Sequence, residues 1–366
     1  MVDALASAVR LVSEVNLPRI LAIADRPGWA IDRKTQNLRR ALKGRFEIIE
    51  RFQHEVTESD VNAADIVLIF YWLQFSKLSV PESVLAQRSD RLLIGICGHR
   101  ELEGDFREEG LATLRRLARA VFVNNRRLEH EYGPLLPVPV HYTPNGVDTT
   151  FFCPSQEPRP RSGELRVGWA GSLANHGPAH RGFHEVIEPA VAAVPGARLL
   201  TAIREQRWRN GDEMLDFYRD LDVYVCASRS EGAPNPCLEA AACGVPLVTT
   251  RVGSMPELIR DGDNGLFFDG TAEGLANKLA LLRDTPSLRS RMAARMLETI
   301  REWDWDVLAE NYARMFGSLL TADWAAEPEI YRFRPTLPGL TFVAPIVNRM
   351  TRKSLFLLRK ITKKPS

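Results

Sequence analysis

The sequence predicts an α/β protein with two domains, each built on a parallel β-sheet covered by helices. Its length of 366 residues is long for a single hydrophobic core and suits two domains of roughly 150 residues each. Between residues 222 and 250, a short apolar run, a polar loop, a helix-forming segment and a second apolar run follow one another. This order is typical of a β-loop-α-β unit, the repeating element of a parallel sheet.

The composition indicates a globular protein from a reducing compartment. Hydrophobic residues make up 45% of the chain and charged residues 26%, which is ordinary for a soluble protein. The five cysteines are scattered, which argues against a disulfide framework. No apolar run reaches the about 18 residues of a spanning helix, and the first ten residues lack the cationic and apolar regions of a signal peptide. We therefore expect a cytoplasmic protein.

The net charge of +2 conceals a basic tail. Nine of the 48 Lys and Arg residues, and none of the 46 Asp and Glu residues, lie within residues 330–366, so residues 1–329 carry a net charge of −7. Within residues 344–365, seven of these cations are mixed with apolar side chains. Such a segment suits an anionic membrane surface, where each basic residue contributes on the order of 1 kcal/mol. A helix packed on the protein, or a solvated tail, explains the segment equally well.

The first domain is predicted over residues 1–150. It begins with an apolar strand at residues 19–24, a turn that contains Gly28, and an amphipathic helix at residues 32–42 with Asp32 as the expected cap. A strand, a glycine-bearing loop and a helix form the first unit of a Rossmann-like domain. Gly28 is a candidate for close backbone approach to a ligand, and a simple turn explains it equally well.

One histidine in this domain follows a predicted central strand. His99 comes just after the apolar run at residues 91–97, and the carboxyl ends of parallel strands form the ligand-binding edge of such sheets. A lone histidine is more often an ordinary loop residue, and its position at a strand end makes His99 the first candidate in this domain. Arg100 and Arg107 are weaker candidates for contacts with a second substrate. The remaining strands of the domain are predicted at residues 46–50, 65–70, 120–124 and 138–143.

The domain boundary is predicted at a turn. Pro144-Asn-Gly-Val-Asp148 supplies a turn with positive φ, and a proline-rich linker follows at residues 153–163. The second domain is predicted over residues 164–303. A long helix is expected at residues 304–320.

The most informative stretch follows the apolar run at residues 222–227. Glu231 comes off this strand, and a helix is expected to begin near Pro236 with Asn235 as its cap. Free N–H groups at a helix start, together with the helix dipole, form a site for phosphate. Glu239 is expected on the first turn of that helix, and Gly244 ends it. A carboxylate beside such an anion site requires hydrogen-bond donors, and sugar hydroxyls are natural ones.

Residues 228–265 resemble the nucleotide-sugar signature of retaining glycosyltransferases of family 4. A Glu, seven residues, a second Glu, a helix of small residues, Cys-Gly, a proline-containing strand, Pro-Glu-Leu-Ile and Asp-Gly-x-Asn-Gly all stand at the family's spacing. The turn at residues 144–148 also matches the family's pattern. The resemblance implies the GT-B architecture, in which two Rossmann-like domains face each other across a cleft. It also implies that the helix at residues 304–320 crosses back onto the first domain.

The resemblance further implies the reaction and the roles of its residues. A sugar would move from a nucleoside-diphosphate sugar to a hydroxyl, with retention at the anomeric carbon and without a cofactor. Glu231 would hold the donor sugar, Glu239 the ribose, and His99 would orient the sugar. Arg181 stands at the family's Lys position and would hold the leaving diphosphate. Ser172, however, replaces the family's other phosphate-binding cation, an Arg.

Backbone groups complete the predicted donor site. Those of Gly171 and Ser172 are candidates to compensate for the missing Arg. Because Pro234 and Pro236 lack N–H groups, only three backbone donors are expected at the helix start. Arg204 is interpreted equally well as a phosphate or base ligand and as a solvated surface residue. The donor-binding candidates are Gly28, Gly171, Ser172, Arg204, Ala233, Asn235, Cys237, Leu238 and Glu239.

Other functions find less support in the sequence. The Asp-x-Asp patterns at residues 220–222, 261–263 and 304–306 each have a structural explanation, so we expect no catalytic metal. No Gly-x-Gly-x-x-Gly follows a strand, which argues against a nicotinamide-dependent oxidoreductase. A catalytically silent GT-B protein that binds a nucleotide or glycan is the second hypothesis. We expect no nucleic-acid partner; the basic tail hints at a lipid-linked acceptor on the inner face of a membrane.

Overall fold

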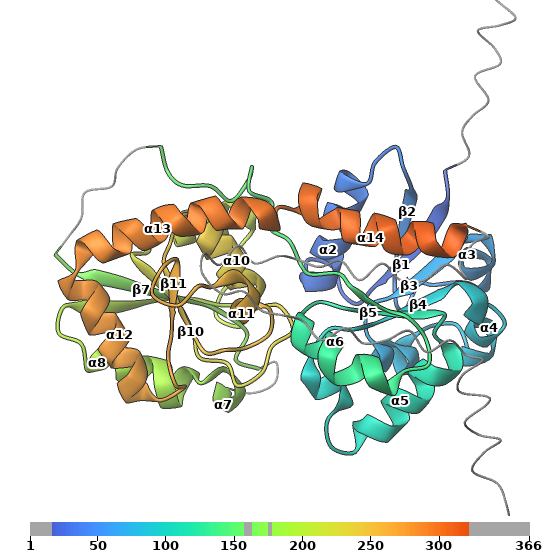
Figure 1. The fold of residues 1–366 in the computed structure, drawn as a ribbon, viewed down its shortest axis with the longest axis horizontal. Helices are drawn as coiled ribbons and strands as arrows, with labels where there is room; N and C mark the ends of the chain where they lie inside the picture. Colours follow the sequence, from blue (N-terminus) through green and yellow to red (C-terminus); the bar gives the residue numbers. More distant parts are fainter. Residues whose placement is uncertain (1–16, 157–162, 175–177, 322–366) are drawn as a thin grey trace, which may run out of the picture. The chain divides into compact units, whose positions relative to one another are not determined.

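The computed structural model describes residues 17–156, 163–174 and 178–321. These residues form two parallel sheets flanked by helices (Figure 1). The first sheet has six strands in the order β2-β1-β3-β4-β5-β6, and the second has five in the order β11-β10-β9-β7-β8. Every strand pair within these sheets is parallel, which confirms the predicted α/β class. The predicted basic tail lies outside the described residues.

The four inner strands of the first sheet are short apolar runs and are buried on both faces, whereas the edge strands are partly exposed. Its strands are β1 (Arg19–Ala24), β2 (Glu47–Phe52), β3 (Ile66–Ile69), β4 (Leu92–Ile96), β5 (Ala120–Val123) and β6 (Val140–Tyr142). The helices between them are α2 (Ala30–Ala41), α3 (Glu58–Ala63), α4 (Glu82–Ala86), α5 (Phe106–Leu117) and α6 (Arg126–Tyr132). Short 3-10 turns lie at Trp72–Lys77, Ser89–Arg91, His99–Leu102 and Gly133–Leu135.

The second sheet is built in the same way. Its strands are β7 (Leu165–Gly171), β8 (Ala197–Ile203), β9 (Val223–Cys226), β10 (Leu247–Thr249) and β11 (Gly265–Phe267). Its helices are α7 (Pro178–Arg181), α8 (Glu188–Ala192), α9 (Gly211–Arg219), α10 (Asn235–Ala242), α11 (Met255–Leu258), α12 (Ala272–Asp284) and α13 (Pro286–Ile300). A π-turn at Phe183–Ile187 precedes α8, and a 3-10 turn at Arg301–Trp303 follows α13.

The last described helix, α14 (Trp305–Leu320), packs on the first sheet. Its residue Tyr312 is fully buried, with its ring centroid 6.1 Å from that of Phe122 on β5. The Asp304 carboxylate caps the helix by accepting from the N–H of Asp306. The chain therefore crosses from the first half to the second and back again.

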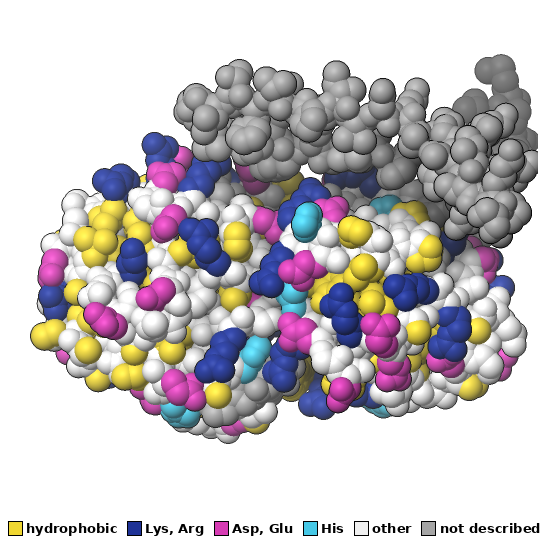
Figure 2. All heavy atoms as spheres, turned by 60° about the horizontal axis from the view of Figure 1, so that its bottom comes forward, with side chains coloured by type: hydrophobic (Ala, Val, Ile, Leu, Met, Phe, Trp, Pro, Cys, Tyr) yellow, Lys and Arg dark blue, Asp and Glu magenta, His cyan; other side chains and the backbone are white. Residues whose placement is uncertain are grey.

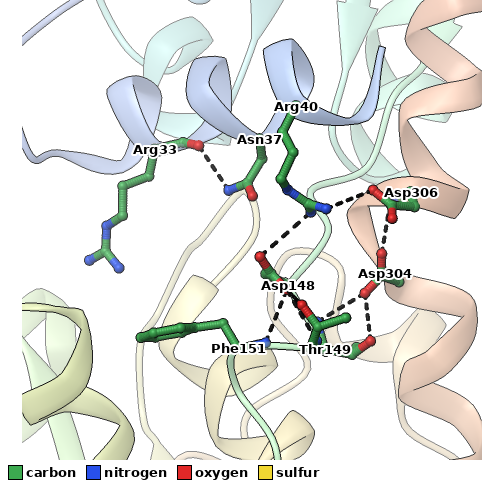
Figure 3. A network of polar contacts seen from close by, with 9 residues as sticks. Arg33, Asn37, Arg40, Asp148, Thr149, Phe151, Asp304 and Asp306 are labelled. Carbon is green, nitrogen blue, oxygen red and sulfur yellow. Dashed lines mark hydrogen bonds and ion pairs between the residues drawn. The ribbon is translucent and has the colours of Figure 1, made fainter. Parts of the chain in front are cut away.

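The two crossings are tied together beside α2 (Figure 3). The backbone N–H of Val147 donates to the Trp303 carbonyl, 2.9 Å away. Arg40 of α2 forms ion pairs with Asp148 on the outgoing segment, at 3.6 Å, and with Asp306 on the returning one, at 2.9 Å. These contacts fix both crossings against the same helix.

Three expected details of helix geometry are wrong. Helix α2 begins at Ala30, so Asp32 lies inside its first turn and accepts from the Gly28 N–H at 2.5 Å. Helix α10 begins at Asn235, whose side-chain oxygen accepts from Asn145, 2.9 Å away, instead of capping the helix. Glu239 is consequently the fifth residue of α10 and lies beyond the first turn. In both cases a tertiary partner or a tight turn outweighs the local capping preference.

On the face shown in Figure 2, basic and acidic side chains are interspersed over the described surface. This face therefore lacks the single basic stripe that nucleic-acid-binding proteins often present.

Candidate functional site

The start of α10 brings together two of the predicted residues. Glu231, in the loop between β9 and α10, forms an ion pair with Arg181 at the end of α7. The same Glu231 oxygen accepts a hydrogen bond of 2.8 Å from the Ser228 hydroxyl. Gly182 makes this approach possible, because it has φ of 62° and a Cβ there would lie only 2.6 Å from the Ala227 carbonyl oxygen. The sequence thus places a cation and a carboxylate at the amino end of a helix.

A histidine that sequence reasoning left without a role lies beside this pair. His180 precedes Arg181, and its carbonyl accepts from the N–H of Arg229 at 3.0 Å. Burial lowers the pKa of His180, although neighbouring Glu231 acts in the opposite direction. His180 is the third residue of the four-residue helix α7. No pattern in the sequence predicted that this helix would bring His180 beside Glu231.

Glu239 faces the other half of the chain. One of its carboxylate oxygens accepts from the Tyr218 hydroxyl at 2.6 Å, and the other pairs with Arg33 of α2 at 3.1 Å. Burial raises the pKa of Glu239, with only 8% of the residue exposed, while Arg33 and the Tyr218 hydroxyl oppose that shift.

Glu239 lines a cavity between α2, α10 and the two crossings. In Figure 3, Arg33 extends from α2 away from the ion pairs of Arg40. The cavity is lined by Ala30, Arg33, Lys34, Asn37, Gly146, Val147, Asp148, Phe152, Asn235, Glu239 and Trp305. Residues from both halves of the chain therefore enclose it.

The predicted backbone donors of α10 are partly engaged. The N–H of Cys237 donates to the Pro234 carbonyl at 2.9 Å, so it serves the turn and is not available to a ligand. The side chains of Cys237 and Leu238 are buried in the core. Among the described residues we find no acceptor for the N–H groups of Ala233 and Asn235. These two remain as donors at the helix start.

The loop after β7 already holds a carboxylate. The Ser172 hydroxyl and the N–H groups of Leu173 and Ala174 all donate to Glu205, the latter two at 3.0 and 3.4 Å. Although burial opposes the shift, these hydrogen bonds lower the pKa of Glu205. The donors to this internal anion are the Ser172 side chain and the backbone of the next two residues. A phosphate role for the backbone N–H groups of Gly171 and Ser172 themselves stays a prediction.

The β1–α2 turn meets the loop after β8. The Arg204 guanidinium lies over the Trp29 ring at 4.2 Å from its centroid, and Arg26 lies 5.0 Å from the same ring. Gly28 has φ of 71°, and no atom lies within 4 Å of where its Cβ would be. The conformation of Gly28 therefore fits a turn, and the described protein makes no close approach to it.

His99 is directed into its own half of the chain. It is 5% exposed, and its Nε2 lies 3.1 Å from a carboxylate oxygen of Glu131 on α6. Burial lowers the pKa of His99, although Glu131 raises it. No contact joins His99 to Glu231 or Arg181 in the structure. Gly98 separates it from the strand, so the backbone of Gly98, and not the imidazole, approaches the loop containing Glu231.

Two side chains that the sequence did not single out hold the halves together near the site. Asn125 donates to the carbonyl of Gly232 at 2.9 Å, and a Cβ at Gly232 would collide with the Cys97 carbonyl. Glu257 accepts from the N–H of Arg126 at 2.7 Å and from the Tyr142 hydroxyl at 2.5 Å. The loop of Glu231 is therefore fixed between the two sheets.

The Asp-x-Asp patterns take structural roles. Asp220 and Asp222 both pair with Arg166, Asp261 accepts from the N–H of Phe267, and Asp304 caps α14. Within the described ranges, no group of three or more His, Cys, Asp or Glu side chains could hold a metal ion. In the same ranges, no helix is long and apolar enough to span a bilayer.

Sequence comparison finds that the second half of the chain is similar to known transferases. Residues 167–284 match the family model described as "Glycosyl transferases group 1". A lipopolysaccharide core biosynthesis glycosyltransferase, LpsE of Rhizobium meliloti, is 33% identical over 161 residues, which cover 38% of this chain and 46% of that protein. A D-inositol 3-phosphate glycosyltransferase of Corynebacterium efficiens is 32% identical over 116 residues, which cover 31% and 27%. The matches thus span less than half of each relative.

Structural comparison extends over both halves. A sucrose-phosphate synthase from Thermosynechococcus elongatus aligns with a TM-score of 0.67 and 15% identity, covering 83% of this chain and 99% of its own. HepE of Anabaena, solved with UDP-glucose, aligns with a TM-score of 0.64 and 15% identity, covering 82% and 99%. The predicted GT-B architecture is thereby confirmed.

Proposed function

We propose that this chain, whose residues 167–284 are related to the group 1 glycosyl transferases, moves a sugar from a nucleoside-diphosphate sugar to a hydroxyl group with retention at the anomeric carbon. The observation that carries the proposal is the ion pair of Arg181 and Glu231 at the start of α10. The fold is shared with HepE, which was solved with UDP-glucose.

Each partner of this ion pair has a natural replacement in such a donor. The diphosphate is an anion that competes with Glu231 for the Arg181 guanidinium. The hydroxyls of the sugar are donors that replace Arg181 on the Glu231 carboxylate. Binding therefore exchanges one set of charge-assisted contacts for another and leaves neither charged group unpaired.

Glu239 is suited to the ribose. Its carboxylate is held by Tyr218 and Arg33 and lines the cavity beside α2. A carboxylate offers about four acceptor sites, so it still has room for ribose hydroxyls. In this arrangement the phosphate binds at the amino end of α10, and the nucleoside binds further along the same helix, at Glu239.

The chemistry follows from where negative charge develops. The bond between the anomeric carbon and the diphosphate oxygen breaks, and its electron pair stays with the diphosphate. The acceptor oxygen bonds to the anomeric carbon on the same face, and its proton passes to the departing diphosphate. Arg181 and the N–H groups of Ala233 and Asn235 stabilise the leaving charge. His99 stays the first histidine to test on the opposite side, where it would orient the sugar.

We propose a hydroxyl of a glycan, a lipid-linked sugar or a small molecule as the acceptor. The name of LpsE supports a role in polysaccharide or glycolipid synthesis, which would place the protein at the cytoplasmic face of a membrane. The basic segment at residues 330–366 would contribute to such binding. Pelleting of the full chain with anionic vesicles, against a chain ending at Glu329, tests this part; equal recovery in the supernatant would refute it.

The proposed reaction is tested in two steps. A thermal-shift screen of UDP, GDP, ADP and their sugars identifies the donor, since a ligand at 100 times its dissociation constant adds about 2.7 kcal/mol of stability. Donor hydrolysis and transfer to acceptor hydroxyls are then measured with the best ligand. A catalytically silent binding protein would show the thermal shift and release no sugar. Sugar release or transfer above the rate without protein supports the enzyme.

A further inference from the structure

The protein places two arginines over one tryptophan, with a third arginine nearby. Arg204 follows β8. Its backbone N–H donates to the Gly171 carbonyl at 3.0 Å, so its backbone lies beside the end of β7. Its guanidinium lies 4.2 Å from the Trp29 centroid, and that of Arg26 lies 5.0 Å from it. Two cations from different halves thus share one aromatic ring.

Arg33 belongs to the same group. Burial lowers the pKa of Arg204 first, and the nearby charges of Arg33 and Arg26 lower it further, so Arg204 is repelled by both cations. Cation–π attraction to Trp29 offsets part of this repulsion. The remaining repulsion favours an anion between the three groups.

The acidic neighbours do not neutralise the cluster. Among the described residues neither Arg26 nor Arg204 forms an ion pair, and Arg33 pairs with Glu239 at 3.1 Å. Glu205 is next to Arg204 in sequence, but its carboxylate accepts hydrogen bonds from the loop after β7. The Asp25 carboxylate accepts from the backbone N–H of Arg26 at 2.8 Å and so serves the turn. Within the described part of the protein, the guanidinium groups of Arg26 and Arg204 are therefore not held by a carboxylate.

The arginine cluster, formed by Arg26, Arg33 and Arg204, touches two parts of the proposed donor site. Arg204 contacts Gly171, beside the position where the resemblance implies a phosphate-binding cation and Ser172 stands instead. Through Arg33 the cluster reaches Glu239, the residue assigned to the ribose. A diphosphate would lie between these two parts.

We propose that Arg204, Arg33 and Arg26 bind the diphosphate of the donor in place of the cation that is absent at Ser172, and that Trp29 holds Arg204 in position. This inference rests on the proposed function. It adds that the first half of the chain supplies cations to the donor site. Donor binding then requires both halves, and the diphosphate is held from two sides, by Arg181 and by this cluster.

The test compares a nucleoside diphosphate with its parent nucleoside on the full chain. Calorimetry measures both ligands on wild type, Arg204→Met, Arg33→Met and the control Arg207→Met. Arg207 lies in the same loop, is 65% exposed and pairs with Glu213. Methionine keeps much of the side chain and removes the charge, and thermal midpoints confirm folding.

We expect Arg204→Met and Arg33→Met each to weaken the nucleoside diphosphate about tenfold or more, because each removes a charge-assisted contact. Nucleoside affinity should stay within about twofold, and Arg207→Met should match wild type. Trp29→Leu should weaken the nucleoside diphosphate by less than Arg204→Met. The dependence of diphosphate binding on salt should also fall in Arg204→Met.

Two results would overturn the inference while leaving the proposed function intact. One is wild-type affinity of Arg204→Met and Arg33→Met for the nucleoside diphosphate. The other is an equal loss of nucleoside and nucleoside diphosphate, which would assign the cluster to the base or to structure. If wild type itself binds no nucleoside diphosphate, the proposed function fails and the inference fails with it.

Discussion

The two sheets carry contrasting charged pairs beside their carboxyl edges. In the second sheet, Arg181 and Glu231 are oppositely charged groups that a diphosphate and a sugar can separate. In the first, His99 and Glu131 lie 3.1 Å apart, and Glu131 also pairs with Arg127 at 2.7 Å. Burial lowers the pKa of His99, which disfavours the charged form of the imidazole in that pair, although Glu131 acts in the opposite direction. The second-sheet pair is therefore suited to anion chemistry, whereas in the first sheet Glu131 holds His99 against α6.

Replacing the second-sheet pair should have the largest effect. We expect Glu231→Ala and Arg181→Met to reduce transfer by on the order of a hundredfold to a thousandfold, as for removal of a group that stabilises a transition state. Glu231→Ala should leave nucleoside-diphosphate affinity largely intact, whereas Arg181→Met should weaken it. Initial rates and calorimetry measure both, with Arg207→Met as the control. Turnover of Glu231→Ala at the wild-type rate would refute the role of Glu231.

The glycine that positions Arg181 should come next. Gly182→Ala places a Cβ 2.6 Å from the Ala227 carbonyl in a backbone conformation with φ of 62°. We expect a loss of about 2 kcal/mol or more in the free energy of unfolding, together with lower transfer activity. Gly133→Ala, at a position with open space and negative φ, is the control. Equal urea midpoints for the two variants would contradict the close approach of α7 and β9.

The nucleoside end of the site should respond more weakly. We expect Glu239→Gln to weaken nucleoside-diphosphate binding about tenfold, since it removes one charged acceptor for the ribose. Wild type should discriminate against the 2′-deoxy nucleotide, and Glu239→Gln should lose that discrimination. Glu273→Gln, on the exposed start of α12, should behave as wild type. If Glu239→Gln still discriminates fully, the ribose is recognised by another residue.

The first-sheet pair should affect stability only slightly. The folded protein binds the His99 proton less readily than the unfolded chain, where histidine titrates near about 6.5. Unfolding free energy therefore falls as pH drops through about 6.5. His99→Gln should reduce this fall by less than about 1 kcal/mol between pH 8 and 5.5 in urea titrations. An unchanged slope in His99→Gln would contradict the burial argument.

The contrast between the sheets also explains what the sequence could predict. Glu231, Glu239 and Gly244 belong to a pattern of many residues at fixed spacing, which constrains a strand, a loop and a helix together. His99 is a single residue that follows a strand, and its side chain meets Glu131 of α6 in the same half of the chain. A strand end therefore predicts the edge of a sheet more reliably than the direction of one side chain.

Contacts between distant segments gave no signal in the sequence. Glu205 occupies the loop after β7 from 31 to 33 residues away, and Trp29 meets Arg204 across the two halves. Likewise, the expected cap Asn235 is taken by Asn145, 90 residues away. Local capping and turn preferences amount to about 1 kcal/mol, so one tertiary hydrogen bond can outweigh them. Such contacts become predictable only once the fold places the segments side by side.

The most direct test of the central claim is a crystal structure of the full chain with the nucleoside-diphosphate sugar that stabilises it most. The account predicts the diphosphate at Arg181 and the N–H groups of Ala233 and Asn235, with the sugar hydroxyls on the Glu231 carboxylate. A structure in which the donor binds elsewhere while Arg181 and Glu231 stay paired would contradict it.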